Sequence, residues 1–578
     1  MNSQEIAVIF REIAEILELK GENPFRIRAY LRAAERVEQL GSELEVIADK
    51  GQLTEIPGIG VDLASKIREL LSTGSLTYYQ QLKKEIPEGL LKMLNIQGLG
   101  PKTVKRLYQE FNIDSIEKLE KYARSGKLGQ IEGIKEKTQK NILRGIELLK
   151  EGSSRLLLPQ AIKIAEDFLS QLKKLKEVEK IEVGGSLRRQ KETVRDIDIL
   201  VASSKPLTVI EKFTRLAPVK EILSHGETKA SVIAGGDNVQ VDLRVVDKKS
   251  FGSSLLYFTG SKSFNIALRG YVQKKGYKIN EYGVFSVNVG AHSRAPKPLA
   301  GKTEEGIFSL LKMSYIPPEL REDRGEIEAA LKDNLPKLVE TKEMKGDFHV
   351  HSLYSDGKNT IQEMAEAAQK RGYKYLGISD HSQSLKVAGG LSIKELKDSI
   401  EEIEKINRKL KGIKVLAGTE VDILAEGGID YPESILKELD FVIAAIHSGF
   451  KQPKAKQTKR IISACKNKYV NFIAHPTGGL WGVRDPYQID LEEVLKAASD
   501  YGVALEINCH PERYDLNDIS AMQAKQRGVK LALNTDSHSV EQLQLIDLGI
   551  SVARRAWLTS SDIVNCMSLG ELEKWLKK

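Results

Sequence analysis

The sequence has few cysteines and no long apolar run. Its three cysteines among 578 residues, Cys465, Cys509 and Cys566, match neither a disulfide framework nor a zinc ribbon. No apolar stretch approaches the roughly 18 residues of a membrane span. The N-terminal stretch MNSQEIAVIFREIAEILELKG carries Glu within its apolar pattern, which predicts an amphipathic helix rather than a signal peptide. We therefore expect a cytoplasmic protein that does not act at a membrane.

Length and charge indicate several domains and a polyanionic partner. A chain of 578 residues is too long for a single hydrophobic core. Residues 101–300 contain 37 Lys and Arg against 23 Asp and Glu, whereas residues 346–578 contain 31 against 32. The basic middle favours contact with nucleic acid, although a solvated lysine-rich surface explains it about equally well.

The hydrophobic periodicity changes along the chain. Residues 1–150 read as short helices separated by glycine turns, and a period of two begins near residue 178 in KIEVGG, RDIDILVA and VQVDLRVV. After residue 346, apolar strands such as YLGISD and VALEIN alternate with helical stretches, which is typical of an α/β barrel or a layered parallel sheet.

Glycine pairs open two of the predicted N-terminal helices, Gly58 with Gly60 and Gly98 with Gly100. Such turns leave backbone amides uncovered at a helix N-terminus, where they bind phosphate without reading base sequence. Lys102 follows the second pair. Both segments resemble helix-hairpin-helix motifs, although ordinary turn glycines are the alternative. A third copy has Lys135 in place of its second glycine, and we expect it to be structural.

Three aspartates lie on two predicted strands in the middle of the chain. Asp196 and Asp198 are two residues apart, so that their side chains share one strand face, and Asp242 lies on a later strand with the same alternation. Converging carboxylates repel one another unless cations bind between them, which predicts two Mg²⁺ ions for phosphoryl transfer. A solvent-facing Asp-x-Asp pair is the alternative. Upstream, GGSLRR offers a triphosphate site through Gly184, Gly185, Ser186, Arg188 and Arg189.

These motifs resemble the palm of the X-family DNA polymerases, and residues 255–285 are similar to the thumb of that family. The resemblance implies that Tyr257 and Phe258 bracket the sugar of an incoming nucleotide and that Gly260 allows close backbone approach. It also implies that Asn265 contacts the base or minor groove and that Arg269 senses the template pair. Lys262 stands where animal relatives commonly have an acidic residue, so the resemblance is weaker there.

Residues 1–90 are similar to the small lyase domain of the same family. The stretch NPFRIRAYLRAA, with Arg26 and Tyr30, matches a segment that binds a 5′-phosphate. Lys66 falls where the family has its Schiff-base lysine, but Asp62 and Tyr78 replace two neighbouring lysines. We expect phosphate binding here and keep lyase activity as a hypothesis.

Six of the nine histidines in the chain lie near the ends of predicted C-terminal strands. His349 and His351 are spaced to share one strand face, and further His, Asp and Glu residues end later strands, where sites in α/β folds assemble. The nine candidate ligands are His349, His351, Asp356, His381, Glu420, His447, His475, Asp536 and His538. This nitrogen and oxygen set suits up to three Mn²⁺, Zn²⁺ or Fe²⁺ ions, and the alternative is a buried structural cluster.

The same set resembles the PHP (polymerase and histidinol phosphatase) domain, motif by motif. We expect Asp380 to orient a neighbouring ligand and His510 to lie just outside the ligand set. Arg484 and Arg513 are candidates for phosphate contact, and His225 and His292 are assigned no role.

The resemblance covers the chain and implies a multidomain fold. The parts are an all-α helix-hairpin-helix region, an α+β nucleotidyltransferase palm with a thumb, and a C-terminal distorted α/β barrel. The expected boundaries are 1–90 for a lyase-like domain, 91–150 for fingers, 151–248 for the palm, 249–320 for the thumb, 321–345 for a linker and 346–578 for the PHP domain.

The implied function is a bacterial X-family DNA polymerase that fills short gaps in DNA repair. Its PHP domain would act as a 3′-5′ exonuclease or 3′-phosphodiesterase and could cut at abasic sites. Implied partners are gapped or primed DNA, dNTPs and base-excision-repair proteins, with the protein a monomer in the cytoplasm at the nucleoid. The alternatives are a metabolite phosphatase with an accessory N-terminal part and a non-catalytic DNA-end scaffold.

Overall fold

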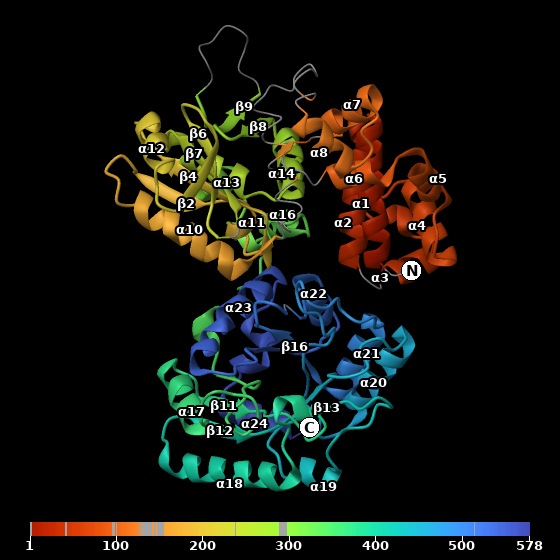
Figure 1. The fold of residues 1–578 in the computed structure, drawn as a ribbon, viewed down its shortest axis with the longest axis vertical. Coiled ribbons are helices and arrows are strands. Elements are labelled where there is room, and N and C mark those ends of the chain that lie inside the picture. Colours follow the sequence, from red (N-terminus) through yellow and green to blue (C-terminus); the bar gives the residue numbers. More distant parts are fainter. Residues whose placement is uncertain are drawn as a thin grey trace. The chain divides into compact units, whose positions relative to one another are not determined.

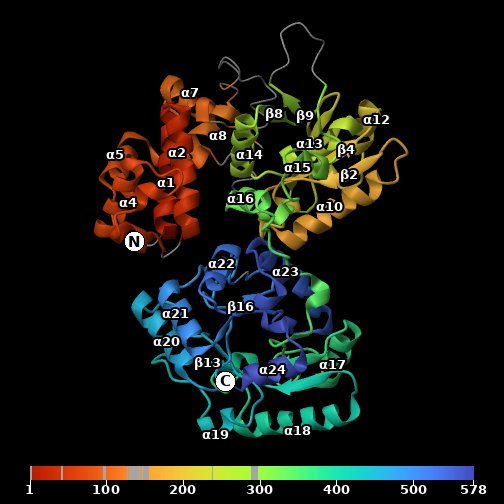
Figure 2. The same cartoon turned by 180° about the vertical axis from the view of Figure 1, so that it is seen from behind.

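The computed structural model describes residues 3–40, 43–94, 99, 101–125, 128, 142–143, 146, 155–236, 238–287, 297–513 and 515–577. The chain divides into two compact units. The first contains Met1–Leu156, Ile164–Val183 and Arg195–Thr303, and the second contains Leu157–Lys163, Gly184–Val194 and Glu304–Lys578. Figure 1 labels the elements and Figure 2 shows them from behind. In the described part of the chain, no helix is long and apolar enough to cross a membrane.

The first unit begins with two helices of 18 and 17 residues, longer than the sequence predicts, and shorter helices follow. On the first helix, Ile6, Phe10, Ile13 and Leu17 recur at helical spacing and are fully buried, and the ring of Tyr30 on the second helix meets Phe10 edge-on at 5.5 Å. The all-α expectation for this region is confirmed in its described residues. The helices are α1 (Ser3–Lys20), α2 (Pro24–Leu40), α3 (Glu43–Asp49), α4 (Val61–Thr73), α5 (Thr77–Glu85), α6 (Glu88–Met93), α7 (Pro101–Phe111) and α8 (Ile116–Arg124).

A five-stranded sheet follows in the order β2-β4-β7-β6-β5, with β4 and β7 parallel at its centre. Burial alternates strictly along β7, so one face of the sheet packs on the core and the other stays partly open. The elements are β1 (Leu156–Leu157), α10 (Leu158–Leu172), β2 (Lys180–Val183), β4 (Asp196–Ala202), α12 (Pro206–Phe213), β5 (Val219–His225), β6 (Lys229–Ala234) and β7 (Val239–Val246).

Two helices and a hairpin complete the first unit. They are α13 (Phe251–Thr259), α14 (Lys262–Lys274), β8 (Tyr277–Asn280) and β9 (Gly283–Ser286). Phe251 and Leu255 of α13 pack on Leu200 and Ala202 of β4. This packing connects the thumb-like helices to the strand that carries Asp196 and Asp198.

The second unit contains eight parallel strands in two sheets, β10-β11-β12 and β13-β14-β15-β16-β17. Isolated parallel bridges between Val350 and Ser537 and between His381 and Glu420 join the two sheets into a ring. The predicted distorted α/β barrel is therefore confirmed. The strands are β10 (Gly346–Asp347), β11 (Tyr375–Ile378), β12 (Lys414–Ala417), β13 (Glu420–Asp422), β14 (Ile443–Ala445), β15 (Phe472–Ile473), β16 (Ala504–Asn508) and β17 (Leu531–Asn534).

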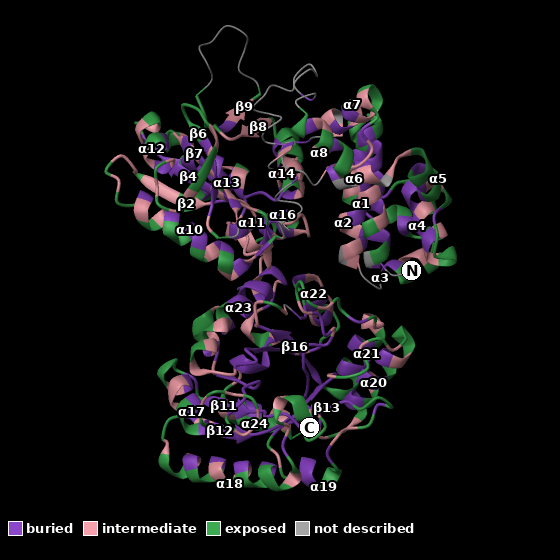
Figure 3. Cartoon of the chain, viewed as in Figure 1, coloured by how far each residue is buried: buried purple, intermediate pink, exposed green. Residues whose placement is uncertain are grey.

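Helices surround these strands, which Figure 3 colours as buried. Apolar residues fill every position of β11 and β14 to β17 except the polar groups that reach the site described below. The helices are α17 (Ile361–Lys370), α18 (Ile393–Lys409), α19 (Glu433–Leu436), α20 (Lys454–Lys466), α21 (Leu491–Tyr501), α22 (Asp518–Gln526), α23 (Ile546–Arg555) and α24 (Leu569–Leu576).

Residues 321–345, which the sequence predicts as a linker, lie within the second unit. Arg321 and Glu326 are fully buried there, and α16 (Glu326–Leu331) follows η4 (Pro318–Leu320). The same unit contains α11 (Gly185–Arg188), β3 (Thr193–Val194) and α15 (Glu304–Leu310). Polar composition misled the linker prediction, because Arg321 pairs with Glu304 and Glu326 accepts from the backbone amides of Asp323 and Arg324 inside the unit.

The aromatic core of the barrel gives a stability prediction. A Cβ added at Gly418 would lie 2.3 Å from the Phe441 ring, whereas a Cβ at Gly570, on α24, would meet nothing within 4 Å. We expect Gly418→Ala to destabilise the barrel by about 1–3 kcal/mol through overpacking. Gly570→Ala should stabilise it by up to about 1 kcal/mol because alanine favours helix. Calorimetry of both variants would measure this difference, and equal transition temperatures would contradict it.

Candidate active sites

Strand register brings the three palm aspartates to one sheet face. Asp198 of β4 pairs in parallel register with Asp242 of β7, and Asp196 pairs with Gln240. Ile197 and Ile199 are buried on the opposite face, while the aspartates are half-buried. Side chains at matching positions of neighbouring strands lie side by side. The sheet therefore gathers three carboxylates where a cation could bridge them.

The electrostatics of this face fit a divalent ion. Burial, followed by repulsion from Asp242, raises the pKa of Asp196, and the nearby Arg195 and Arg155 oppose the shift. Gln240 Nε2 donates to Asp242 Oδ2 at 2.7 Å, but the buried Oδ1 has no hydrogen-bond partner among the described residues. A cation ligated by these oxygens would satisfy Oδ1 and relieve the repulsion.

The glycine-serine-arginine segment belongs to the second unit. Gly185 begins α11 with a φ of 57°, a conformation that glycine adopts readily. Arg188 donates to both carboxylate oxygens of Glu304, at 2.8 and 2.7 Å, and Arg189 Nε donates to Glu322 Oε1 at 3.0 Å. Burial opposes ionisation of Glu304, but its arginine partners lower its pKa to about 2. Ion pairs therefore orient both predicted phosphate-binding arginines.

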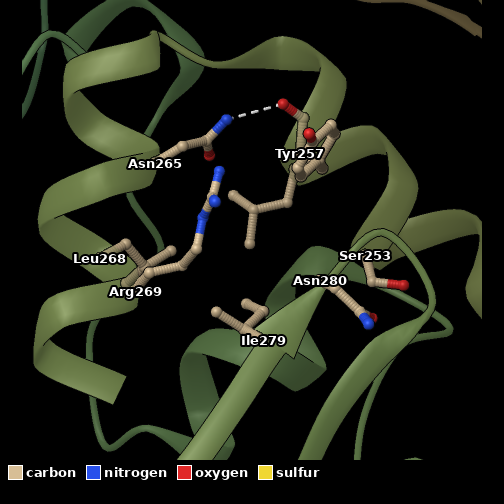
Figure 4. A pocket seen from close by; sticks show the side chains of 8 residues that line it. Ser253, Tyr257, Asn265, Leu268, Arg269, Ile279 and Asn280 are labelled. Carbon is tan, nitrogen blue, oxygen red and sulfur yellow. Dashed lines mark hydrogen bonds between the residues drawn. The ribbon is translucent and has the colours of Figure 1, made fainter. Parts of the chain in front are cut away.

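Three of the predicted thumb residues, Tyr257, Asn265 and Arg269, line one pocket, seen in Figure 4. Asn265 Nδ2 donates to the Tyr257 carbonyl at 2.7 Å, and the Arg269 guanidinium lies 5.5 Å from the Tyr257 ring centre. Phe258 meets Tyr257 edge-on at 5.1 Å, and Gly260 caps α13 with a φ of 70°. The pocket is lined by Ser253, Leu256, Tyr257, Asn265, Leu268, Arg269, Ile279 and Asn280. Lys262 lies in the first turn of α14.

The first glycine turn has the predicted geometry. Gly58 has a φ of 91°, and Gly60 is the N-cap of α4 without a capping side chain. Backbone amides at this helix start are therefore left for an outside acceptor. Gly98, Gly100, the Lys102 side chain and Lys135 of the third copy lie outside the described residues.

A small cluster surrounds the candidate lyase lysine. Lys66 pairs with Asp62, and its ammonium lies 5.1 Å from the Tyr78 ring centre. Arg26 donates to the Tyr78 hydroxyl at 2.9 Å, and Tyr30 stacks on Tyr78 at 6.4 Å. The residues that the sequence grouped around Lys66 therefore lie together, and Asp62 and Tyr78 contact Lys66 directly.

All nine predicted ligands of the barrel come together at the C-terminal ends of its strands. Glu420 lies at their centre, since its Oε2 is 2.9 Å from His381 Nδ1 and 3.3 Å from His349 Nε2. Its Oε1 is 2.9 Å from His475 Nε2 and 3.3 Å from His447 Nε2. With His351 Nε2 at 3.8 Å from Oε2, one buried carboxylate therefore contacts five imidazoles.

The remaining ligands extend this cluster. Asp536 Oδ1 lies 3.3 Å from His351 Nε2, and Asp356 lies 3.6 Å from His381 and 3.4 Å from His538. Three overlapping groups have donor atoms within 4.8 Å of one another. They are His351 with Asp356, His381 and His538; His349 with His351 and Asp536; and His381 with Glu420 and His447.

Protonation and unpaired atoms show that these residues fit metal ions. His349 Nδ1 lies 2.7 Å from Glu506 Oε1, so the proton sits on Nδ1 and the Nε2 lone pair faces the cluster. Several buried nitrogen and oxygen atoms of the cluster lie close to one another but have no partner in hydrogen-bond geometry among the described residues. They are His349 Nε2, His351 Nδ1 and Nε2, His381 Nδ1, Glu420 Oε2 and His475 Nδ1. Buried polar atoms are rarely left unpaired unless a ligand or ion satisfies them.

Charge and backbone conformation also mark this cluster as a functional site. Burial opposes ionisation of Glu420, but attraction to His349, His447 and His381 holds its pKa well below the ordinary value. His475 and Asp536 have backbone φ values of 27° and 53°, which residues other than glycine seldom adopt. Such conformations concentrate at functional sites.

Two supporting carboxylates were missed by the sequence analysis. Glu506 on β16 orients His349, and Asp422 on β13 lies 2.5 Å from His447 Nδ1. Asp422 is two residues after Glu420 on the same strand face, which is the spacing that identified the two histidines. Asp380 accepts from Ser352 N at 2.8 Å, so it orients the loop between His351 and Asp356, in line with its predicted supporting position.

The predicted phosphate-binding arginines lie at different distances from the cluster. Arg513 Nε is 3.5 Å from Asp536 Oδ2, at the edge of the ligand set. Arg484 stacks on Phe450 at 3.8 Å and donates to the Gly478 carbonyl at 2.8 Å. The amide of His510 donates to Asn508 Oδ1 at 2.9 Å.

A palm sheet with three carboxylates, a thumb pocket and a barrel with clustered imidazoles define a nucleotidyltransferase joined to a phosphoesterase-type domain. Comparisons with known families agree. The DNA polymerase beta thumb model matches residues 254–322, and the PHP domain model matches 347–510. A helix-hairpin-helix domain matches residues 1–76, and a SAM-like helix-hairpin-helix tandem matches 90–147.

One known relative matches the chain over its full length. The protein named DNA polymerase/3′-5′ exonuclease PolX from Bacillus subtilis (strain 168) is 37% identical over 579 residues, covering 100% of both chains. A probable phosphatase from Thermoanaerobacter sp. (strain X514) is 32% identical over 243 residues, covering 40% of this chain and 94% of that relative. The chain therefore belongs to the bacterial X-family DNA polymerases that carry a C-terminal PHP domain.

The support of His349 by Glu506 can be tested through metal content. We expect Glu506→Gln to lower metal affinity by about 10–100-fold, because the amide cannot hold the proton on Nδ1 as a carboxylate does. Elemental analysis after dialysis against graded chelator would measure this loss. Glu433→Gln, at a mostly exposed position of α19, is the matched control. Equal metal content in both variants would contradict the role of Glu506.

Proposed function

We propose that the protein is a DNA-directed DNA polymerase that fills short gaps in DNA repair and trims 3′ ends at its PHP domain. The single observation that carries this proposal is the coexistence of two intact candidate sites, three palm carboxylates on adjacent strands and nine clustered barrel ligands. The relative from Bacillus subtilis, whose name includes both polymerase and 3′-5′ exonuclease, supports the same pairing.

At the palm, Asp196, Asp198 and Asp242 would hold two Mg²⁺ ions. At the barrel, the nine ligands would hold up to three Mn²⁺, Zn²⁺ or Fe²⁺ ions. Bound divalent ions supply charge neutralisation and an activated water for attack at phosphorus. The nucleotide would be bound by Gly185, Ser186 and Arg189 at its phosphates and by Tyr257, Phe258, Gly260, Asn265 and Arg269 at its sugar and base.

Around the barrel ligands, Glu506 and Asp422 hold the Nδ1 protons of their histidines and so direct Nε2 toward the cluster. Arg513, beside Asp536, would bind the scissile phosphate. We propose 3′-5′ exonuclease and 3′-phosphodiesterase action at this site, with cutting at abasic sites as a further activity.

The N-terminal helices would hold the DNA around the gap. Gly58 and Gly60, together with Gly98, Gly100 and Lys102, would contact backbone phosphates, and Arg26 and Tyr30 would contact the 5′-phosphate. A monomeric state, base-excision-repair partners and a cytoplasmic place at the nucleoid belong to the same proposal, as do the predicted domain limits apart from the linker at 321–345.

Hydrolysis of a terminal phosphate is a second candidate activity for the barrel. Relatives named as probable phosphatases match only part of this chain, 40% of it for the relative from Thermoanaerobacter sp. (strain X514). Single-stranded DNA that competes with a small phosphate ester for hydrolysis would show that both use one site.

Two substitutions should separate the proposed activities. We expect Asp196→Ala to abolish nucleotide addition on a 5′-phosphorylated gapped duplex while 3′ trimming continues, because only the palm carboxylates are disturbed. His349→Ala should do the reverse. Primer length with Mn²⁺, with and without dNTPs, measures both activities. Loss of the same activity in both variants would contradict the division of labour.

The lyase hypothesis at Lys66 has a direct test. If Lys66 is the nucleophile, borohydride should trap a covalent adduct between the wild-type protein and DNA with an abasic 5′ end, since reduction fixes a Schiff base. Lys66→Ala should give no adduct. Arg68→Ala, on the same helix, is the control and should still form it. If the wild-type protein forms no adduct, the lyase hypothesis is wrong, whereas the proposal of 5′-phosphate binding is not affected.

A further inference from the structure

The segment that carries the predicted phosphate-binding residues is anchored to the C-terminal barrel. Gly184–Val194 belongs to the second unit, whereas Asp196 follows directly in the first. The anchor is formed by Arg555, at the end of α23, a helix that packs against β16 and β17 of the barrel. The Arg555 side chain is fully buried.

Arg555 and Arg189 share one carboxylate oxygen. Arg189 Nε donates to Glu322 Oε1 at 3.0 Å, and Arg555 Nη1 donates to the same oxygen at 2.9 Å. Arg555 Nη1 also donates to the Arg189 backbone carbonyl at 2.9 Å. The buried guanidinium therefore contacts the backbone carbonyl of Arg189 and also the carboxylate that pairs with the Arg189 side chain. These contacts fix the position of the Arg189 backbone and the direction of its side chain.

A second carboxylate holds Arg555 itself. Its Nη2 donates to the buried Asp518 Oδ2, on α22, at 2.6 Å, and Arg324 donates to the same oxygen at 3.1 Å. Beside this network, the Ser551 hydroxyl, one turn earlier on α23, donates to Gln190 Oε1 at 3.0 Å. Two neighbouring residues of the segment are thus bound to one helix of the barrel.

The opposite charges in this network give it a definite geometry. Burial opposes ionisation of Glu322, but Arg555 and Arg189 lower its pKa to about 2, so the carboxylate is charged at neutral pH. The buried Asp518 and the partly buried Glu322 face three arginines, each with defined hydrogen-bond geometry. Buried ion pairs of this kind add little net stability but impose a definite geometry, because any other arrangement leaves a charge unpaired.

We propose that Arg555 is a positioning residue for nucleotide addition: through Glu322 and the Arg189 carbonyl it holds the Gly184–Arg189 segment in the shape that binds a nucleotide triphosphate. This inference rests on the proposed polymerase function. It assigns to a helix of the C-terminal barrel a role in nucleotide affinity, separate from the hydrolytic ligands of that barrel.

Three variants and one control test the role. Glu322→Gln keeps the shape but removes the charge that both arginines share. Arg555→Lys keeps a charge but loses the planar fork, and Arg555→Met loses both. Arg554→Met is the matched control, since the neighbouring Arg554 pairs instead with Glu319 at 2.8 Å and the Val339 carbonyl at 3.1 Å.

We expect Glu322→Gln and Arg555→Met to raise the KM for dNTP on a gapped primer about tenfold, which corresponds to one lost charge-assisted contact, with little change in kcat. Arg555→Lys should recover part of the loss. The double variant Glu322→Gln with Arg555→Lys should be little worse than Glu322→Gln alone, because both act through one contact. Arg554→Met should keep the wild-type KM.

Amide hydrogen exchange supplies a readout that does not depend on polymerase activity. Residues 184–194 should exchange faster in Glu322→Gln and Arg555→Met than in Arg554→Met. If Arg555→Met loses 3′ trimming and its thermal transition, its fold has failed, and Glu322→Gln and Arg555→Lys decide the question. KM values and exchange equal to those of Arg554→Met would overturn the proposal. A wild-type protein that adds no nucleotide would contradict the proposed function, and exchange would still decide whether Arg555 holds the segment.

Discussion

Mutual attraction between the buried carboxylate of Glu420 and the imidazoles around it is the interaction on which the barrel site depends. A lone buried carboxylate costs several kcal/mol, which the surrounding histidines offset only if their ring nitrogens are aimed correctly. Glu506 and Asp422 fix that aim from neighbouring strands. The short parallel strands of the barrel are thus connected at their C-terminal ends by charge as well as by backbone hydrogen bonds.

The palm meets a related constraint with different chemistry. Its three aspartates gather by register on adjacent strands, and the carboxamide of Gln240 is the neutral partner that the structure gives to Asp242. An all-oxygen set favours Mg²⁺, whereas the mixed nitrogen and oxygen set of the barrel favours Mn²⁺, Zn²⁺ or Fe²⁺. If both sites bind metal as proposed, their ligand atoms would select different ions.

Local pattern was enough to predict the residues that share a strand face. Alternation identified Asp196 with Asp198 and His349 with His351, and the recurrence of His, Asp and Glu at strand ends identified the rest of the barrel set. It missed Glu506, because an acidic residue in a strand carries no local sign that a histidine from another strand will face it. It also missed Asp422, although the spacing of Asp422 from Glu420 on one strand was a usable signal. It also read residues 321–345 as a linker, since buried ion pairs between distant segments, such as Arg555 with Glu322, leave no periodicity in the sequence.

The division of the chain into two units explains why the linker prediction for residues 321–345 failed. The segment 184–194 leaves the first unit, packs within the second and returns directly to β4 and its aspartates. Arg189 is therefore connected covalently to the palm but oriented by charges of the second unit. A segment held in this way cannot change its geometry without either breaking a buried ion pair or moving with α23. If this segment binds nucleotide as proposed, its affinity for a nucleotide would depend on how α23 packs on the barrel, even though the two sets of metal ligands share no residue.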